Sequence, residues 1–338
     1  MDNTILEIRN LKTYFYTRHG VVKAVDGVSF SLRRGEILCL VGESGCGKTA
    51  TALSILRLID SPPGRIIDGE ILYHGEDLLH CSDGKLRHIR GNRVAMIFQD
   101  PQSSLNPVFT VGDQISEQIK LHLGSRHKQT RERTLHLMEQ VGIPRAAERM
   151  KDYPHQFSGG MRQRVMIAAA LSCDPEILIA DEPTTALDTT IKAQILDIFQ
   201  DLKQKRNMSI LFITHDLGTV ASIADRIVVM YGGKIAEAGT ALDIFDQPQH
   251  PYTQGLINCL PDISTRRDRL TPIPGMIPTL IDPPRGCIFN PRCEKRMSIC
   301  SQENPPQIII SGEHLIACHL YPPSAIPQDK TEVIENAK

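Results

Sequence analysis

Eight residues between 42 and 49 have types and spacing suited to binding phosphate. They read Gly42-Glu43-Ser44-Gly45-Cys46-Gly47-Lys48-Thr49, which fits the pattern G-x-x-x-x-G-K-[ST]. Glycines let backbone N–H groups turn inward around an anion, and the positive end of a following helix adds attraction. We expect Lys48 to reach the β- and γ-phosphates of a nucleotide, and the Thr49 hydroxyl to bind Mg²⁺.

A second group of reactive side chains follows an apolar run at 177–180. Asp181 and Glu182 come directly after Ile-Leu-Ile-Ala, which is typical of a buried strand. Asp181 can hold Mg²⁺ through water, and Glu182 can accept a proton from an attacking water. An acidic pair after a strand is often only a solvated loop, so its meaning depends on the phosphate loop upstream.

These two groups need strands that end at them and helices that follow. The first thirty residues alternate as strands do, interrupted by a turn at 18–20. Further strands are expected at 36–41, 177–180 and 210–213, and helices at 49–59, 112–142, 161–171 and 189–205. In the second helical stretch the expected inward residues are Leu121, Leu135, Met138 and Val141. This alternation predicts an α/β domain that ends near residue 260.

Composition limits the classes of protein to consider. The 338 residues carry 38 basic and 39 acidic side chains, which does not indicate a nucleic-acid-binding surface. No apolar run reaches the roughly 18–20 residues of a membrane span, and the first residues do not resemble a secretory signal. We therefore expect a cytosolic protein, with any membrane role exerted through a partner.

Several further motifs occur in a fixed order. They are Ile97-Phe98-Gln99-Asp100-Pro101, Ser158-Gly159-Gly160-Met161-Arg162-Gln163-Arg164, Asp188 after Ala186-Leu187, and Thr214-His215-Asp216. With the phosphate loop and the acidic pair, this order resembles the ABC ATPase family over residues 5 to about 260. The resemblance implies a P-loop ABC-type ATPase domain at 1–260, an α/β fold with a RecA-like core and a helical signature subdomain at roughly 100–170.

The resemblance also implies roles for single residues. Ser158, Gly159 and Gly160 would form the signature motif, which binds the γ-phosphate of ATP carried by a second, homologous ATPase subunit. Gln99 would bind near Mg²⁺ and sense the γ-phosphate, while His215 would contact that phosphate. Phe15, chosen over its tyrosine neighbours, would stack on adenine, and Asp188 would lie at the dimer interface. Met161 replaces the family's usual glutamine, but capping by backbone amides does not depend on that side chain.

Three segments resemble the peptide and nickel importer branch of the family. They are 99–107 (Gln-Asp-Pro-Gln-Ser-Ser-Leu-Asn-Pro), 250–253 (His-Pro-Tyr-Thr), and a C-terminal stretch with 273–278 (Ile-Pro-Gly-Met-Ile-Pro), Gly286-Cys287 and Pro291-Arg292-Cys293. The last is closest to the first ATPase subunit of dipeptide and oligopeptide importers. This branch implies two transmembrane permease subunits, an extracytoplasmic peptide-binding protein, and a peripheral location on the cytoplasmic face of the cell membrane.

The chain beyond residue 260 is rich in proline and contains four of the nine cysteines. We expect a loop-rich extension at 261–325 and a disordered tail at 326–338. Cys287, Cys293, Cys300 and Cys318 have the spacing C-x5-C-x6-C-x17-C, without the tight pairs usual for Zn²⁺. The spacing favours an iron–sulfur cluster, and the resemblance implies [4Fe–4S]; Zn²⁺, free thiols and a disulfide stay open, as do His314 and His319 as ligands.

The sequence thus predicts an ATP- and Mg²⁺-dependent ATPase that energises import of di- or oligopeptides. Nickel or another small cargo is an alternative, because these motifs separate branches better than substrates. A soluble, non-transport ABC ATPase and an iron–sulfur sensor are further alternatives. The near-neutral charge argues against a nucleic-acid-associated ATPase, and the complete set of catalytic motifs argues against a sensor.

Overall fold

The computed structural model describes residues 3–100, 104–185, 187–260 and 272–321. In these ranges the chain forms two compact units. The phosphate-loop unit contains residues 4–31, 38–79 and those from 214 onward, and the helical unit contains residues 32–37 and 80–213 with Asn3. Predictions that concern residues 101–103, Ala186, the segment 261–271 and the tail 326–338 lie outside the described residues.

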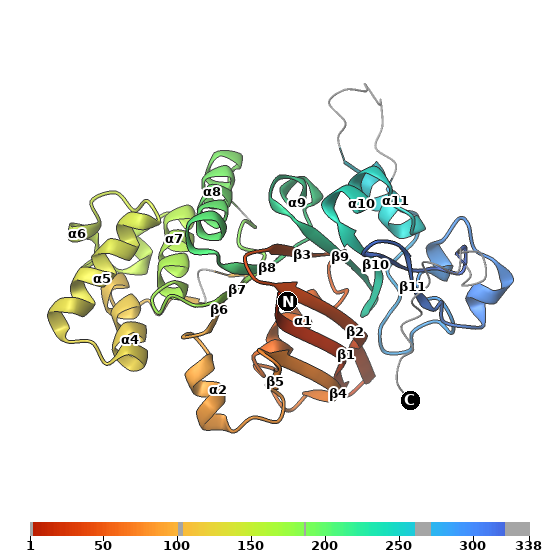
Figure 1. Ribbon diagram of the computed structural model, residues 1–338, viewed down its shortest axis with the longest axis horizontal. Coiled ribbons are helices and arrows are strands. Elements are labelled where there is room, and N and C mark those ends of the chain that lie inside the picture. Colours follow the sequence, from red (N-terminus) through yellow and green to blue (C-terminus); the bar gives the residue numbers. More distant parts are fainter. Residues whose placement is uncertain (1–2, 101–103, 186, 261–271, 322–338) are drawn as a thin grey trace. The chain divides into compact units, whose positions relative to one another are not determined.

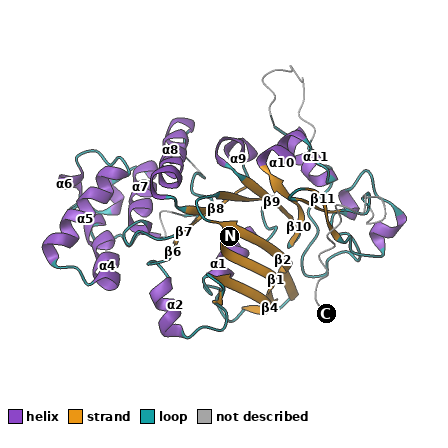
Figure 2. Ribbon diagram, in the orientation of Figure 1, coloured by secondary structure: helices purple, strands orange, loops and turns teal. Residues whose placement is uncertain are grey.

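The phosphate-loop unit begins with an antiparallel sheet, drawn in orange in Figure 2. Its strand order is β2-β1-β4-β5. The strands are β1 (Thr4–Thr17), β2 (Gly20–Arg33), β4 (Gly64–Tyr73) and β5 (Glu76–Asp77). The predicted strands of the first thirty residues are thereby confirmed, including the turn between them.

Five further strands of this unit belong to a second sheet, where they pair in the order β11-β12-β10-β9-β3. They are β3 (Ile37–Val41), β9 (Arg226–Tyr231), β10 (Lys234–Thr240), β11 (Gln307–Ser311) and β12 (His314–Ala317). β3 and β9 run parallel, with Leu40 opposite Val228, and the other pairs are antiparallel. Every residue of β3 is buried, as expected for a parallel strand covered on both faces.

The helices of this unit follow the strands. They are α1 (Lys48–Ile55), α9 (Leu217–Ile223), α10 (Ala241–Asp246) and α11 (Pro251–Asn258), with 3-10 turns η2 (Asn290–Arg292) and η3 (Ser298–Ser301). α1 ends earlier than the predicted 49–59. Arg57 has φ of +50°, and the N–H of Leu58 bonds to the carbonyl of Leu53 at 2.8 Å. This is a Schellman-type ending without its usual glycine, so the residue types did not indicate where the helix ends.

The helical unit contains three parallel strands in the order β8-β7-β6. They are β6 (Val94–Ile97), β7 (Ile177–Asp181) and β8 (Ser209–Thr214). Met96 lies opposite Ile179, which lies opposite Leu211. The apolar runs at 177–180 and 210–213 are therefore strands, as predicted.

Helices make up most of the rest of this unit, and most of them are drawn in yellow and green, the colours of the middle of the chain in Figure 1. They are α2 (Asp83–Ile89), α4 (Val111–Leu123), α5 (His127–Gln140), α6 (Ala146–Arg149), the turn η1 (Pro154–Gln156), α7 (Gly159–Ala170) and α8 (Thr189–Arg206). α4, α5 and α7 pack against one another. The predicted helices at 161–171 and 189–205 are confirmed, apart from one or two end residues.

The single helical stretch predicted at 112–142 is two helices, separated at Gly124, which has φ of +59°. Leu121 was expected to face inward, but 72% of its surface is exposed. α4 buries Val111, Ile115 and Ile119. Leu121 is two positions after Ile119, and residues two apart point to opposite sides of a helix. Met138 and Val141 are buried as predicted, and Leu135 is half-buried.

The proline-rich segment contains more structure than expected. Its described part is mostly loop, but β11 and β12 form a hairpin that joins β10, with Ile316 opposite Glu237. Ile308–Ile310 before Gly312 was an available signal for a strand and turn. In the described parts of the chain, no helix has the length and apolarity that crossing a membrane requires.

Candidate nucleotide site

The loop between β3 and α1 is shaped by two glycines. Gly42 has φ of +152°, and a side-chain carbon there would lie 2.2 Å from the carbonyl oxygen of Met230. Gly47 has φ of +105°, and the same carbon would lie 2.1 Å from the carbonyl oxygen of Ala24. No other residue fits these positions, because the backbone conformation and the neighbouring backbone both exclude a side chain.

Lys48 is folded back onto this loop. Its ammonium donates to the carbonyl oxygens of Gly42 at 2.8 Å and Glu43 at 3.0 Å, and contacts the sulfur of Cys46 at 3.7 Å. The sulfur is the weakest of these acceptors, so a phosphate oxygen can replace it without opening the loop. Burial raises the pKa of the Cys46 thiol, while the nearby Lys48 acts in the opposite direction. Thr49 is exposed at the start of α1.

The aromatic residues of β1 point to opposite faces. The Tyr14 hydroxyl donates to Asp26 at 2.8 Å, and Arg65 covers the exposed ring of Tyr16. Phe15 shares a face with Thr13, whose hydroxyl hydrogen-bonds at 2.8 Å to Ser54 of α1. Of the three rings, Phe15 is therefore the one on the face of β1 that contacts the helix of the phosphate loop.

In the helical unit, the acidic pair lies where β7 ends. Asp181 is the last strand residue and is buried, whereas Glu182 is half-buried with φ of +48°. One oxygen of Glu182 accepts hydrogen bonds from the side chains of Gln99 at 3.1 Å and Thr185 at 2.9 Å. The structure thus brings the predicted glutamine and the predicted base together. A carboxylate oriented by two donors suits general-base chemistry.

The signature segment begins α7. Ser158 is the N-cap and accepts from the backbone N–H of Met161 at 3.4 Å, so the capping interaction uses only the backbone of Met161. Ser158 and Gly159 are exposed. Gly160 is buried, and a side-chain carbon there would lie 2.5 Å from Ile191 of α8. The motif therefore presents an accessible helix N-terminus, which attracts anions.

Two other predicted residues lie at the ends of secondary structure. Asp188 is the N-cap of α8 and accepts from the N–H of Ile191 at 2.9 Å. His215 is exposed between β8 and α9, next to Asp216, which caps α9. The phosphate loop, Phe15 and His215 belong to the phosphate-loop unit. Gln99, the acidic pair, the signature segment and Asp188 belong to the helical unit.

The four clustered cysteines lie in the phosphate-loop unit, and all nine thiols of the chain are free of disulfides. Backbone N–H groups donate to each of the four sulfurs. The donors are Phe289 and Asn290 for Cys287, Lys295 for Cys293, Met297 for Cys300 and Leu320 for Cys318. Burial raises the pKa of Cys318 to about 11, and the other three thiols add to this rise. Within the described ranges, however, no three His, Cys, Asp or Glu side chains are grouped to hold a metal ion.

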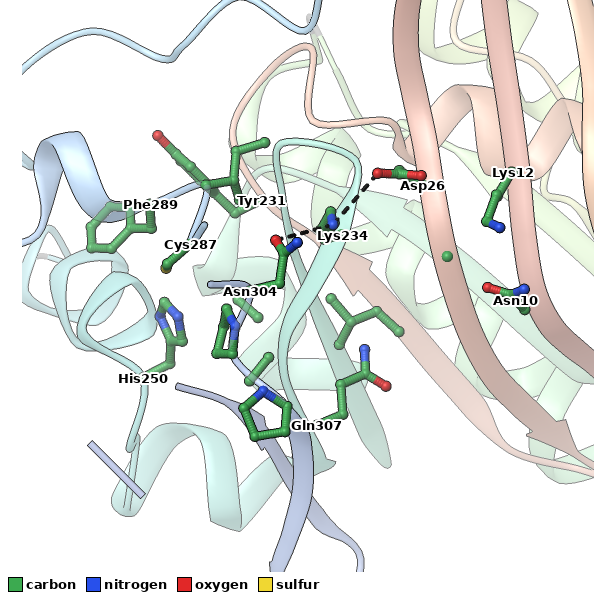
Figure 3. Close-up of a pocket in the computed structure, with 17 residues that line it drawn as sticks. Asn10, Lys12, Asp26, Tyr231, Lys234, His250, Cys287, Phe289, Asn304 and Gln307 are labelled. Carbon is green, nitrogen blue, oxygen red and sulfur yellow. Dashed lines mark hydrogen bonds and ion pairs between the residues drawn. The ribbon is translucent and has the colours of Figure 1, made fainter. Parts of the chain in front are cut away.

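A cavity of about 520 Å³ lies beside Cys287 in the same unit (Figure 3). Tyr231, His250 and Phe289 surround one end of it. In the middle of the view, Lys234 contacts Asp26 at 3.5 Å and the side chain of Asn304 at 3.4 Å, and Asn10 and Lys12 lie at the far side. No residue of the phosphate loop lines this cavity, so it is not the nucleotide site.

Three side chains of the site had no role assigned from the sequence. Thr185 orients Glu182, and the only sequence feature that could have indicated this contact is its position three residues after Glu182. The hydroxyl of Tyr252 accepts from the N–H of Glu43 at 2.9 Å, and Arg292 forms an ion pair with the Glu43 carboxylate at 2.6 Å. Tyr252 and Arg292 belong to the branch-specific motifs, but their distance along the sequence concealed the contact with the phosphate loop.

Comparison with known protein families gives two matches. The family described as "ABC transporter" matches residues 25–185, and "Oligopeptide/dipeptide transporter, C-terminal region" matches residues 236–300. The first match contains the phosphate loop, the signature segment and the acidic pair. The second contains Tyr252, Arg292 and three of the four clustered cysteines.

Similar proteins span nearly the whole chain. The dipeptide transport ATP-binding protein DppD of Bacillus subtilis is 51% identical and covers 94% of both chains. The oligopeptide transport ATP-binding protein AppD of the same organism is 50% identical, covering 94% of this chain and 97% of its own. DppD of Escherichia coli is 46% identical, with the same two coverages as AppD.

Among solved structures, the dimeric ATP-binding cassette MJ0796 in a post-hydrolysis state, bound to ADP and Pi, has a TM-score of 0.63 at 24% identity. It covers 70% of this chain and 98% of its own. The protein cbiO1 of Clostridium perfringens has a TM-score of 0.62 at 24% identity, covering 73% and 92%. At these identities the likeness shows a shared fold.

Proposed function

We propose that this chain hydrolyses ATP to energise the import of dipeptides or oligopeptides. The chain belongs to the ABC transporter family and has the C-terminal region of the oligopeptide/dipeptide branch of that family. The observation that carries the proposal is the coexistence of the two family regions in one chain, with relatives aligned over 94% of it. The first region supplies the ATPase, and the second separates this branch from others.

The assignment of the nucleotide site rests on the local geometry of each unit. Lys48 and the backbone N–H groups of the loop would bind the β- and γ-phosphates, and Phe15 would stack on adenine. Glu182, oriented by Thr185, would take the proton of the attacking water. His215 would contact the γ-phosphate.

Mg²⁺ is the metal expected with ATP. The exposed hydroxyl of Thr49 and the carboxylate of Asp181 are hard oxygen donors of the kind Mg²⁺ prefers, with the Gln99 amide as a further one. When bound, the ion would neutralise phosphate charge. The residues named here fit the ion by donor type.

A second, homologous ATPase subunit would complete the site. Ser158, Gly159 and Gly160 form the N-terminus of α7, and the exposed Ser158 and Gly159 leave it accessible to the γ-phosphate held by a partner subunit. Asp188, exposed at the start of α8, would lie at this dimer interface. Two subunits arranged in this way enclose two ATP molecules.

The membrane partners would be two permease subunits that receive peptide from an extracytoplasmic binding protein. The helical unit exposes three large apolar side chains close to Gln99 in the sequence, namely Phe98, Val108 and Phe109, with Val108 71% exposed. Exposed apolar side chains of this kind mark interaction surfaces. The chain would then lie on the cytoplasmic face of the membrane, with ATP binding and hydrolysis transmitted through this surface.

We also propose a division into an ATPase domain at 1–260, an extension at 261–325 and a tail at 326–338. In the extension, Cys287, Cys293, Cys300 and Cys318 would bind a structural [4Fe–4S] cluster. Four thiolates are the usual ligands of such a cluster, and backbone N–H groups already point at all four sulfurs, which stabilises sulfur-bound negative charge. Loading has to draw the thiols closer together than they lie in this structure.

Metal analysis tests the cluster. Full-length protein purified without oxygen should contain about four iron and four sulfide per chain, and Cys293→Ser should lose most of both. Cys259→Ser, which changes a thiol outside the quartet, should retain them. Zinc without iron or sulfide in the unmodified chain would refute the cluster.

Cargo is tested in cells that lack this chain. Uptake of a labelled dipeptide should disappear, return with the unmodified gene, and stay absent with Lys48→Ala. Nickel uptake measured in the same strains should not change. Loss of nickel uptake with normal dipeptide uptake would instead assign the chain to the nickel alternative.

A further inference from the structure

The second residue of the phosphate loop is held by the C-terminal region of the chain. Glu43 lies directly after Gly42, and its carboxylate is paired with Arg292, 249 positions later. One guanidinium nitrogen lies 2.6 Å from Oε2 of Glu43, and the other lies 3.1 Å from Oε1. This is the bidentate geometry that makes arginine–carboxylate pairs strong and directional.

Every N–H bond of Arg292 has an acceptor. Besides the two contacts with Glu43, its side chain donates to the carbonyl oxygens of Pro274 at 3.0 Å and Ile273 at 3.3 Å, and to the Tyr231 hydroxyl at 3.4 Å. The guanidinium is buried, so solvent does not screen its charge. Arg292 is therefore a fixed point against which Glu43 is oriented.

The main chain of Glu43 is fixed as well. Its N–H donates to the hydroxyl of Tyr252, a fully buried residue of α11, at 2.9 Å. Its carbonyl oxygen accepts from the ammonium of Lys48 at 3.0 Å. A displacement of Glu43 would therefore move an acceptor of the lysine that is expected to bind phosphate.

The residues that hold Glu43 come from three separate segments of the oligopeptide/dipeptide C-terminal region. Tyr252 belongs to His-Pro-Tyr-Thr, Arg292 to Pro-Arg-Cys, and the carbonyls behind Arg292 to Ile273-Pro274. Their convergence on one residue is not needed to build the sheet or the helix of the site. Its evident effect is on the shape of the loop.

We propose that Arg292 is a positioning residue for ATP binding, through which the cysteine-bearing segment keeps the phosphate loop in its binding shape. The inference rests on the assignment of residues 42–49 as the nucleotide loop, and it does not depend on the cargo or on the cluster.

The test measures equilibrium binding of ATP and steady-state hydrolysis with the purified full-length chain. Arg292→Gln and Glu43→Gln should each weaken ATP binding about tenfold, since each removes a partly buried, charge-assisted contact. The double variant should be no weaker than the single ones, because both changes remove the same interaction. KM for ATP should rise while kcat changes little, whereas a smaller folded fraction would lower kcat at constant KM.

Matched variants separate positioning from general stability. Arg226→Gln and Glu313→Gln break another ion pair between β9 and the C-terminal hairpin, 3.3 Å long and away from the loop, and should leave ATP affinity unchanged. Arg292→Lys keeps the charge without the fork and should restore part of the affinity. If Arg292→Gln does not fold, as judged by its thermal midpoint without nucleotide, Arg292→Lys and Glu43→Gln carry the test.

Two results would overturn the inference. One is unchanged ATP affinity in folded Arg292 and Glu43 variants, and the other is an equal loss in the Arg226 control. Lys48→Ala, measured alongside, distinguishes a failure of the nucleotide-site assignment from a failure of the role proposed for Arg292. If Lys48→Ala also binds ATP normally, the nucleotide assignment itself is wrong; if it alone loses ATP, only the role of Arg292 is refuted.

Discussion

Replacing Glu182 by glutamine isolates the proton-accepting step. The amide has the shape of the carboxylate. Its carbonyl oxygen can still accept the hydrogen bond from Thr185, whose hydroxyl lies 2.9 Å from the carboxylate in the unmodified chain. The contact with the Gln99 amide at 3.1 Å can persist in the same way. The change therefore removes basicity and leaves the local hydrogen bonds in place, so the fold and the affinity for ATP should both be retained.

The size of the effect follows from the role. A positioned general base contributes about 10²- to 10⁴-fold to a rate, which corresponds to about 2.7–5.5 kcal/mol of activation free energy. We expect Glu182→Gln to lower kcat for ATP hydrolysis by this factor. The affinity for ATP should stay within about twofold, since the phosphate loop belongs to the other unit and is unchanged.

The assay compares steady-state phosphate release with equilibrium ATP binding for the same preparation. Glu176→Gln is the matched control, because Glu176 directly precedes β7 and its carboxylate forms ion pairs with two exposed arginines, Arg34 and Arg93. That variant should hydrolyse ATP normally, as such pairs contribute about 0–1 kcal/mol to stability. Normal turnover by Glu182→Gln would remove Glu182 from the proposed role, and equal loss in both variants would point to a folding defect.

Two further predictions concern stability. Burial lowers the pKa of His250 to about 4 from 6.5, so the unfolded chain binds the extra proton between these values and stability falls as the pH falls. The free energy of unfolding, measured with urea, should fall by about 3 kcal/mol across this pH window because of His250. The variant His250→Asn can still cap α11, and its free energy of unfolding should depend less on pH. An identical pH dependence in the two proteins would contradict this. Gly160→Ala should cost about 1–3 kcal/mol, because its methyl group would meet Ile191 at 2.5 Å, whereas Gly159→Ala has open space and should stay within about 0.5 kcal/mol. Equal thermal midpoints for the two alanine variants would show that the contact with Ile191 relaxes freely.

Local patterns were sufficient to predict most of the fold. Continuous apolar runs marked β3, β7 and β8, and helical spacing after Ser158 marked α7. The prediction of an ABC-type α/β cassette is confirmed by the solved cassettes that share its fold. These features could be predicted because each is encoded by neighbouring residues.

The features that were missed depend on structure that periodicity does not encode. α1 ends at a left-handed arginine, a conformation that the residue type does not suggest. Leu121 is apolar but lies on the outer side of α4, so its residue type predicted the wrong environment. The contact between Glu43 and Arg292 joins the phosphate loop to the 3-10 turn η2, which is far away in the sequence, and only the folded chain reveals it.

The most direct test of the account is transport in a reconstituted system. Vesicles that contain this chain with its permease and binding protein should accumulate a labelled dipeptide when ATP and Mg²⁺ are supplied on the side of the ATPase. Accumulation should stop with Lys48→Ala and fall with Glu182→Gln in proportion to its loss of ATP hydrolysis. Dipeptide accumulation that persists with Lys48→Ala, or that does not require ATP, would contradict the claim that this chain powers peptide import.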